Sequence, residues 1–350
     1  MTTNRNLLQL AVASIALTAF FCAPHADGKG RPKPDNPPPT GEIYFENADE
    51  ETQESRLAVM NADGTGKTLL PASLLPEWWQ ATITPSYGIH NGQRWHLRFT
   101  ETSGEVHPDG QPRGILEAVR EDGGARATLV DDPAMYCNIH YSWSKDDSWI
   151  SFAGYKWDES VSPPEPVASA LYVVPIEFDE VGPLPLSEPF AVADGGFEVS
   201  LPSVYPGISV SDWSPQGDRI VFQSEFDLFT IDLLADEVRL LTRSGRQPSW
   251  SPDGQLIAFV SVDSRTNTDL IETIEADDTD ESSRSILLKV RAKKFTSIQL
   301  STPSWSPTGN YLAFTRTESA GVGDFSQDVY RVTNQGEGLA NLTAGVGYSV

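Results

Sequence analysis

Cysteine and basic residues are scarce in this 350-residue sequence, which holds two cysteines, Cys22 and Cys137. So few thiols exclude a disulfide-stapled scaffold and a zinc site of clustered cysteines. Only 25 Lys and Arg stand against 49 Asp and Glu, and the formal net charge is −24. Nucleic-acid binding needs a basic footprint, so we expect no nucleic-acid partner. The charge favours neutral or basic partners.

Long apolar runs are missing except near the N-terminus. Residues 7–21 are mostly apolar, follow Arg5 and precede small and polar residues. This stretch is too short for a comfortable membrane span and has the layout of a secretory signal. We therefore expect residues 1–26 to be a signal peptide and the protein to be periplasmic or secreted, with no transmembrane span.

The residues around the signal also bear on anchoring. Cys22 could carry a lipid, but Phe21 before it is not the small residue that a lipoprotein signal places there, so a lipid anchor is disfavoured. Residues 27–41 are rich in proline and are expected to form an extended linker.

A repeated pattern is the strongest feature that is present. Each copy has a Trp-Ser pair, a turn, an aliphatic residue seven positions after the Trp and a Phe nine positions after it. Four copies with one spacing indicate an internal repeat. Their aromatic residues are Trp143, Trp213, Trp250 and Trp305 with Phe152, Phe222, Phe259 and Phe314.

Three of the copies continue as Ser-Pro-x-Gly. Proline presets φ in a tight turn, and glycine accepts the positive φ that closes it, so antiparallel strands are predicted on either side. The aliphatic residue and the Phe lie two positions apart and point to one sheet face. We interpret the repeat Trp and Phe residues as core, not as sugar-stacking platforms.

Second hairpins follow the first, for example residues 227–233 with 238–241, so each unit is predicted to be a four-stranded meander. Such units must stack, either around an axis as a propeller or in line as a solenoid. The first unit opens at residues 42–45 without an innermost strand, so we expect residues 345–350 to supply it and close a ring. The fold is expected to be an all-β propeller of six units, with five or seven as alternatives: residues 42–78, 79–132, 133–195, 196–245, 246–301 and 302–344.

These segments resemble a known repeat. Residues 250–259, WSPDGQLIAF, and residues 58–66, AVMNADGTG, are similar to the WD40-like repeats of TolB-type β-propellers. Leu-Thr at residues 241–242 and 342–343 resembles their outermost strand. The resemblance covers most of residues 42–350 and implies a six-bladed propeller over that range.

Catalytic motifs are not evident. No Gly-x-Ser-x-Gly nucleophile motif occurs, so a propeller-bearing serine peptidase is not supported. His90, His96, His107 and His140 fall in the second and third units without a zinc-type spacing. We expect no enzymatic activity. The alternative is a polysaccharide-degrading lyase or glycosidase in which these histidines converge at the central channel.

The segment from Asp263 to Glu281 contains eight acids and one base. Calcium would suit such oxygen ligands, but the alternation of Asp with Gly typical of a calcium loop is missing. We expect a mobile acidic loop and no cofactor. The basic cluster at residues 289–294 is interpreted as a solvated face.

The function expected is a non-catalytic scaffold that binds a protein or an envelope polymer through loops and a central channel. Long insertions are predicted at residues 153–166, 191–207, 261–283 and 318–327. Tyr155, Trp157 and Tyr205 are the aromatic residues in these insertions chosen as binding residues, because aromatic anchors carry much interface energy.

Overall fold

The computed structural model of this chain consists of β-strands and turns. It describes residues 41–48, 55–71, 87–106, 112–132, 135–158, 165–166, 170–194, 208–263, 265–266, 268–291, 296–321 and 324–344, some of them by backbone alone. These ranges contain no helix, and hence none long and apolar enough to cross a membrane.

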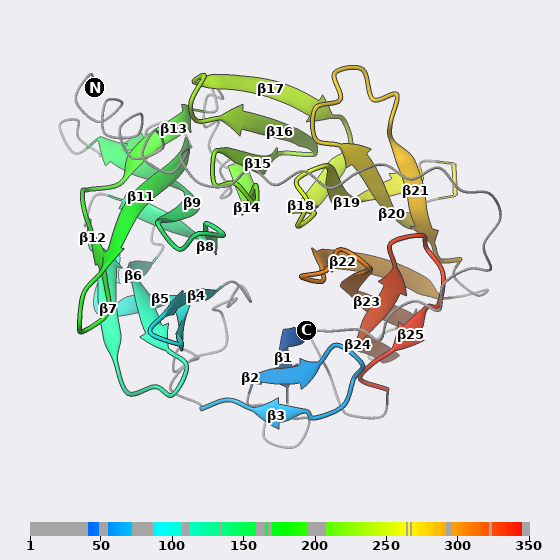
Figure 1. Cartoon of the computed structure of the whole chain (residues 1–350), viewed down its shortest axis with the longest axis horizontal. Helices are drawn as coiled ribbons and strands as arrows, with labels where there is room; N and C mark the ends of the chain where they lie inside the picture. The colour runs from blue at the N-terminus through cyan, green and yellow to red at the C-terminus, as the bar shows by residue number, and fades with distance from the viewer. Residues whose placement is uncertain are drawn as a thin grey trace, which may run out of the picture.

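The strands form six antiparallel sheets, the blades, which stand in a ring around a common axis (Figure 1). Blade 1 contains β1 (Glu42–Ala48), β2 (Ser55–Asn61) and β3 (Thr68–Leu69). Blade 2 contains β4 (Tyr87–His90), β5 (Gln93–Val106), β6 (Pro112–Arg120) and β7 (Arg126–Val130). Blade 3 contains β8 (Met135–Trp143), β9 (Trp149–Asp158), β10 (Glu165–Pro166), β11 (Ala170–Phe178), β12 (Pro183–Pro185) and β13 (Phe190–Asp194).

The other three blades are regular four-stranded meanders. Blade 4 contains β14 (Ile208–Trp213), β15 (Arg219–Ser224), β16 (Asp227–Asp232) and β17 (Glu237–Thr242). Blade 5 contains β18 (Gly245–Trp250), β19 (Leu256–Asp263), β20 (Thr268–Glu275) and β21 (Ser285–Lys289). Blade 6 contains β22 (Ser297–Trp305), β23 (Tyr311–Gly321), β24 (Asp324–Thr333) and β25 (Ala340–Asn341).

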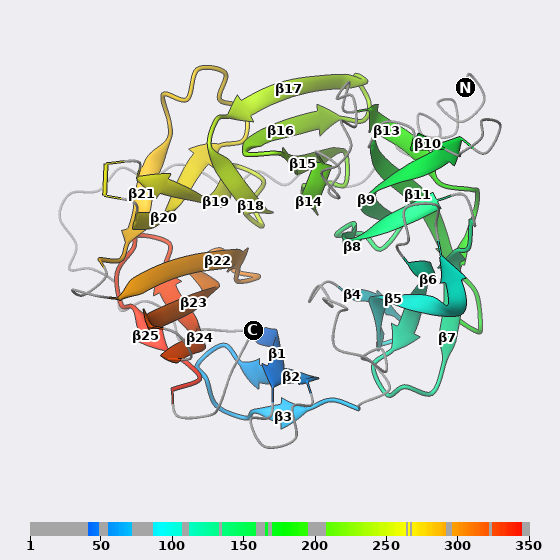
Figure 2. The ribbon, with the colours of Figure 1, turned by 180° about the vertical axis from the view of Figure 1, so that it is seen from behind.

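A separate hydrophobic cluster fills each of the six interfaces between neighbouring blades. Figure 2 shows the same ring of blades from behind. Successive residues of a strand face opposite neighbours, as expected from the period of two. Truncating one such buried Phe to Ala costs about 3–5 kcal/mol. Representative members from the two blades of each cluster, from blade 1–2 round to blade 6–1, are Leu57 and Val119, Leu116 and Phe152, Leu171 and Ile220, Val221 and Phe259, Val260 and Leu312, and Val329 and Met60. The predicted all-β, six-bladed propeller is confirmed.

The repeat serine has a role that the sequence pattern did not reveal. In blade 5 the Ser251 hydroxyl accepts the backbone N–H of Leu256 at 2.9 Å, and Gly254 takes a φ of 76° to close the turn. The same bond recurs at Ser144, Ser214 and Ser306 in the other repeat blades. The serine therefore stabilises all four turns, and the Pro-x-Gly geometry adds to it in blades 4, 5 and 6, which carry that sequence.

Blade 1 has no strand inside β1 among the described residues, and the last blade packs directly against it. Val329 and Leu342 of blade 6 lie in one cluster with Phe45, Ala58 and Met60 of blade 1. This cluster closes the ring. The predicted closing strand at residues 345–350 lies outside the described residues, as do the signal peptide and residues 27–40 of the linker.

The prediction of a mobile acidic loop at residues 263–281 was wrong. Strand β20 runs through this segment and pairs with β19 over eight residues. Leu270, Ile271 and Ile274 are buried in the core. Glu272 pairs with Arg284, and Asp269 pairs with Arg246. The acidic residues made this strand look like a loop in the sequence, because the arginines that pair with them are not close by in sequence.

Two further predicted insertions are also mainly strand. The described residues 318–321 and 324–327 belong to the paired strands β23 and β24, with Glu318 opposite Ser326. In residues 153–166, β9 continues to Asp158 and pairs with β10. Residues 191–194 belong to β13, and residues 195–207 lie outside the described residues.

Candidate functional site

The strands nearest the axis carry a bulge at the same place in four blades. In β18 and β22 the bulge puts Gln247 and Thr302 at φ values of 51° and 50°. Bulges bend a strand and re-aim its side chains, and they are common beside binding sites. The innermost strands of blades 3 to 6 therefore share a bulge at the same place.

Glutamine side chains link the bulge of β18 to the bulge of β22 and to β15, the second strand of blade 4. The Gln223 carbonyl oxygen accepts the backbone N–H of Gln247 at 3.0 Å, and the Gln247 carbonyl oxygen accepts the backbone N–H of Thr302 at 3.0 Å. The chain of bonds runs from blade 4 through blade 5 to blade 6. It holds a polar band in a fixed position on the inner strands, which is suited to recognising a partner without rearrangement.

The predicted binding residues fall partly outside the described part of the chain. Tyr155 and Trp157 lie in strand β9, opposite Tyr136 and Pro166, and not in the loop that was expected. Being two positions apart, they share one face of that strand. Their side chains, and Tyr205 as a whole, lie outside the described residues.

The repeat aromatic residues differ in burial. Trp305 is the exception, because it is only partly buried, and its indole N–H donates to the Ser249 carbonyl at 3.2 Å. The others are nearly inaccessible, with at most 3% of their surface exposed: Trp143, Trp213, Trp250, Phe152, Phe222, Phe259 and Phe314.

The two histidines whose side chains are described face opposite neighbours. His90 stacks on Phe178 of blade 3 with ring centroids 4.6 Å apart. The His96 ring packs against the Tyr44 ring of blade 1, with ring centroids 5.3 Å apart. They therefore do not converge on one site, while His107 and the side chain of His140 lie outside the described residues.

His96 belongs to a titratable cluster between blades 1 and 2. The Tyr44 hydroxyl donates to Glu121 at 3.0 Å, His96 Nε2 lies 3.2 Å from the same carboxylate, and Arg94 lies 3.4 Å from it. These contacts, led by the His96 bond, lower the pKa of Glu121 below its ordinary value. Burial, with the nearby Glu121 charge, raises the pKa of Tyr44.

Arg94 completes this cluster as a bridge between the two blades. Its guanidinium lies over the Tyr44 and Tyr87 rings at 5.8 and 5.3 Å and pairs with Glu42 of β1 at 2.5 Å. Arg94 and Glu121 also line a small cavity of about 240 Å³. Because the guanidinium already has carboxylate and aromatic partners, the cluster is built primarily to hold blade 1 against blade 2.

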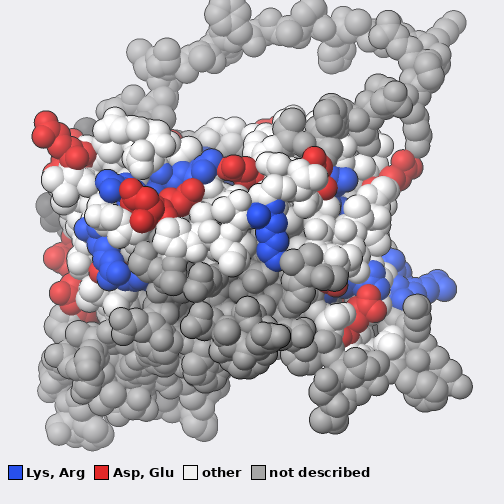
Figure 3. Space-filling view, turned by 90° about the horizontal axis from the view of Figure 1, so that it is seen from below, with Lys and Arg blue, Asp and Glu red and all other residues white. Residues whose placement is uncertain are grey.

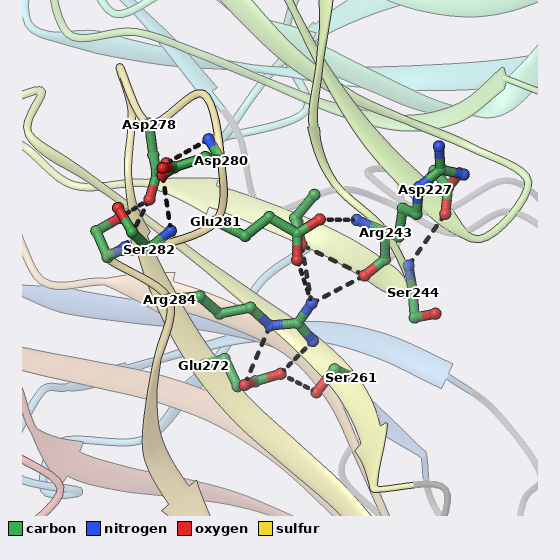
Figure 4. Close-up of polar contacts among 12 residues, drawn as sticks. Asp227, Arg243, Ser244, Ser261, Glu272, Asp278, Asp280, Glu281, Ser282 and Arg284 are labelled. Carbon is green, nitrogen blue, oxygen red and sulfur yellow. Dashed lines mark hydrogen bonds and ion pairs between the residues drawn. The ribbon is translucent and has the colours of Figure 1, made fainter.

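A second polar network fills the interface between blades 4 and 5 (Figure 4). The Arg284 guanidinium makes two contacts with Glu272, at 2.7 and 3.2 Å, and lies 5.2 Å over the Phe259 ring. It also donates to the Arg243 carbonyl at 3.0 Å, while Glu281 accepts the Arg243 backbone N–H at 3.0 Å. Glu281 and Arg284 thus link blade 5 to blade 4, while Glu272 holds Arg284 in place within blade 5.

Two other acids of the segment also reach neighbouring blades. Asp277 pairs with Arg219 and Arg239 of blade 4. Asp269 accepts the backbone N–H of Leu300 in blade 6 at 2.8 Å.

Asp278 and Asp263 are engaged within blade 5. The Asp278 carboxylate accepts the hydroxyl and backbone N–H of Ser283, which lowers its pKa. Lys289 pairs with Asp263 and, as the largest cause, lowers the pKa of that carboxyl to about 2. Within the described ranges, no three His, Cys, Asp or Glu residues are grouped as a metal site requires.

Charges of both signs share the surface. In Figure 3 the described Lys and Arg side chains lie beside Asp and Glu side chains, and neither sign forms a continuous area on that face. Lys289, the first residue of the predicted basic cluster, is already paired with Asp263. This face therefore offers no basic footprint.

The chain matches no protein-family model and no curated protein sequence. Among solved structures, a TolB candidate of Agrobacterium tumefaciens is 18% identical with a TM-score of 0.51, over 85% of this chain and 87% of that one. TolB from Acinetobacter baumannii is 14% identical with a TM-score of 0.47, over 86% and 68%. An oligogalacturonate lyase in complex with manganese is 10% identical with a TM-score of 0.41, over 75% and 61%. The first similarity shows a shared fold: this chain is a TolB-like six-bladed β-propeller.

Proposed function

From this TolB-like fold, we propose that the protein is an exported, non-catalytic scaffold that binds a protein or an envelope polymer. Its binding surfaces are the loops at the ends of the ring and the central channel along its axis. The observation that carries the proposal is the ladder from Gln223 on β15 to Gln247 and Thr302 on the innermost strands β18 and β22, in which the two glutamine side chains are held in place by backbone N–H groups.

Two further features support a binding role. Each blade interface has its own apolar core, so the ring is a rigid support on which loops can vary without loss of the fold. Action outside the cytoplasm rests on the predicted signal peptide at residues 1–26. The low thiol content of the sequence is compatible with an oxidising compartment.

A capture experiment tests the proposal. The purified protein is immobilised, exposed to envelope extract, and the retained molecules are identified by mass spectrometry and glycan analysis. Two variants examine the two proposed surfaces: Tyr155, Trp157 and Tyr205 changed together to alanine, and Gln247→Gly, which keeps the positive φ but removes the polar side chain. Gln255→Ala, at an exposed turn, is the control.

The expected result is one partner retained by the wild type and by the control, and reduced at least about tenfold by one of the two test variants. The affected variant then identifies the surface. Absence of any enriched partner, or equal retention by all four proteins, contradicts the proposal.

A further inference from the structure

A cavity of about 500 Å³ lies between the first hairpin turns of blades 5 and 6. Its walls include Ser251, Pro252 and Leu256 from blade 5 and Trp305 and Asn310 from blade 6. This volume falls in the range of small-molecule sites, which combine apolar walls with a few placed polar groups. The site lies at the first hairpin turns, whereas Gln247 and Thr302 of the glutamine ladder lie in strand bulges.

The cavity exists because one covering side chain is small. In two blades the residue six positions after the repeat Trp lies near the Trp of the next blade: Trp149 shares a core cluster with Trp213, and the Arg219 guanidinium lies 5.1 Å over Trp250. In blade 5 that position holds Leu256, which lines the cavity together with Trp305. Leucine covers less than tryptophan or arginine, so Trp305 stays partly exposed.

Polar groups stand around this aromatic surface. The Asn334 backbone N–H donates to the Asn310 carbonyl at 2.9 Å, which places the two asparagines side by side. Their side-chain amides have no hydrogen-bond partner among the described residues. Each amide offers two donors and one acceptor, a set that matches neighbouring hydroxyl groups.

Charge narrows the class of ligand. Asp253 is the only charged residue among the described lining residues, and one of its carboxylate oxygens already accepts the Ser251 hydroxyl at 2.6 Å and the Gln255 backbone N–H at 3.0 Å. No described cation lines the cavity, so an anionic ligand would meet no counter-charge there. A ligand with an apolar C–H face for the indole and hydroxyl groups for the amides fits both observations.

We propose that this cavity binds a neutral sugar unit of a saccharide, with the ring packed on Trp305 and its hydroxyl groups bonded to Asn310 and Asn334. The inference rests on the scaffold function proposed above and deepens it, because it names a ligand class for one site among the turns at an end of the ring. Neither capture variant changes this cavity, so failure of saccharide binding would leave the capture results for Gln247 and for Tyr155, Trp157 and Tyr205 unaffected.

Calorimetric titration of the purified protein tests the proposal. The probes are four neutral tetrasaccharides, built respectively from β-linked glucose, α-linked glucose, N-acetylglucosamine and xylose, and the anionic tetragalacturonate. At least one neutral probe should bind with a dissociation constant of about 1 mM or tighter, and the anionic probe at least about tenfold more weakly.

Variants then assign the site. Asn310→Ala with Asn334→Ala should weaken binding of that probe at least about tenfold, because these partly or fully exposed side chains serve the ligand and not the fold. Trp305→Leu should do the same. The matched control, Gln216→Ala with Gln255→Ala, changes exposed turn residues outside the cavity and should leave affinity within about twofold.

The asparagine variant keeps the test decisive even if Trp305→Leu unfolds, provided that its melting temperature equals that of the wild type. Three results overturn the proposal: no neutral probe bound at about 10 mM, affinity unchanged in the asparagine variant, or binding at these residues of a synthetic peptide of residues 27–41 in place of any saccharide.

Discussion

The guanidinium of Arg331 donates a 2.6 Å hydrogen bond to the backbone carbonyl of Ala62, across 269 residues of sequence. Arg331 lies on β24 in the last blade, and Ala62 follows β2 in the first. The same guanidinium lies 5.0 Å over the Tyr311 ring. One side chain therefore joins both ends of the ring.

Replacing Arg331 with alanine should destabilise the protein by about 2–3 kcal/mol, because a charge-assisted hydrogen bond and an aromatic contact are lost at the closing interface. Equilibrium urea denaturation measures this. Arg120→Ala removes an arginine whose partner, Asp122, lies in the same exposed turn, and should leave the midpoint almost unchanged. Equal midpoints for the two variants would show that Arg331 has no role in closure.

Gly336 should be intolerant of substitution. It has a φ of 78°, and a Cβ added there would lie 2.1 Å from the Leu287 carbonyl oxygen of blade 5. Gly336→Ala should therefore cost about 3 kcal/mol or more, through backbone strain and a clash that only a backbone shift can relieve.

Gly338 in the same turn is the matched control. Its φ is 66°, but the nearest contact of an added Cβ is 3.7 Å from Thr333. Gly338→Ala should cost only about 1 kcal/mol, the penalty of a side chain in the left-handed region. Thermal unfolding measures the stability of both variants. Equal losses of stability would mean that blade 6 is not closely packed against blade 5 at this turn.

Glu121 should make stability depend on acidity. Its pKa in the folded protein lies below the ordinary value of 4.5, led by the hydrogen bond to His96, so its contribution is fully present above about pH 4.5 and is lost as pH falls through the lower folded pKa. Melting temperatures from pH 7 to 3 should fall more steeply for the wild type than for Glu121→Gln. Glu237→Gln, on the exposed start of β17, should follow the wild type. Parallel curves for all three proteins would show that Glu121 does not contribute to the pH dependence of stability.

Much of the fold could be predicted from the sequence, because each repeat combines turn-forming residues with the two-residue period of a β-strand. The spacing after Trp213 predicts strands at residues 227–233 and 238–241, and the structure has β16 at Asp227–Asp232 and β17 at Glu237–Thr242. Blade 2 was the hardest to recognise. It lacks the Trp-Ser-Pro turn, and its first hairpin instead turns at Asn91 and Gly92, both at positive φ.

The acidic segment shows why sequence reasoning fails at contacts between neighbouring strands. Glu272 looked like part of a solvated loop, yet its side chain is 8% exposed and pairs with Arg284 at 2.7 Å. Twelve residues separate the two, and the bond forms only because β20 and β21 are paired. A buried carboxylate with such a partner cannot be distinguished by composition from a surface acid.

The cavity beside Trp305 was also missed, although its signal is present in the sequence. Position six of each repeat reads Trp149, Arg219, Leu256 and Tyr311. The significance of the small Leu256 emerges only when the structure shows that in two other blades this position lies near the Trp of the following blade. This packing is between residues of two neighbouring repeat units. A pattern that repeats within each unit does not reveal a contact between units.

Ring closure can be tested with a single engineered bond. A Cβ placed at Gly64 of blade 1 lies 3.5 Å from the Leu342 Cβ of blade 6, within the range of a disulfide. In protein freed of its own thiols by Cys22→Ser and Cys137→Ser, Gly64→Cys with Leu342→Cys should join under mild oxidation. Peptide mapping of the monomer should then show residues 64 and 342 linked, with a higher melting temperature than the reduced form. Free thiols, or bonds only between molecules, would contradict a ring in which the sixth blade packs on the first.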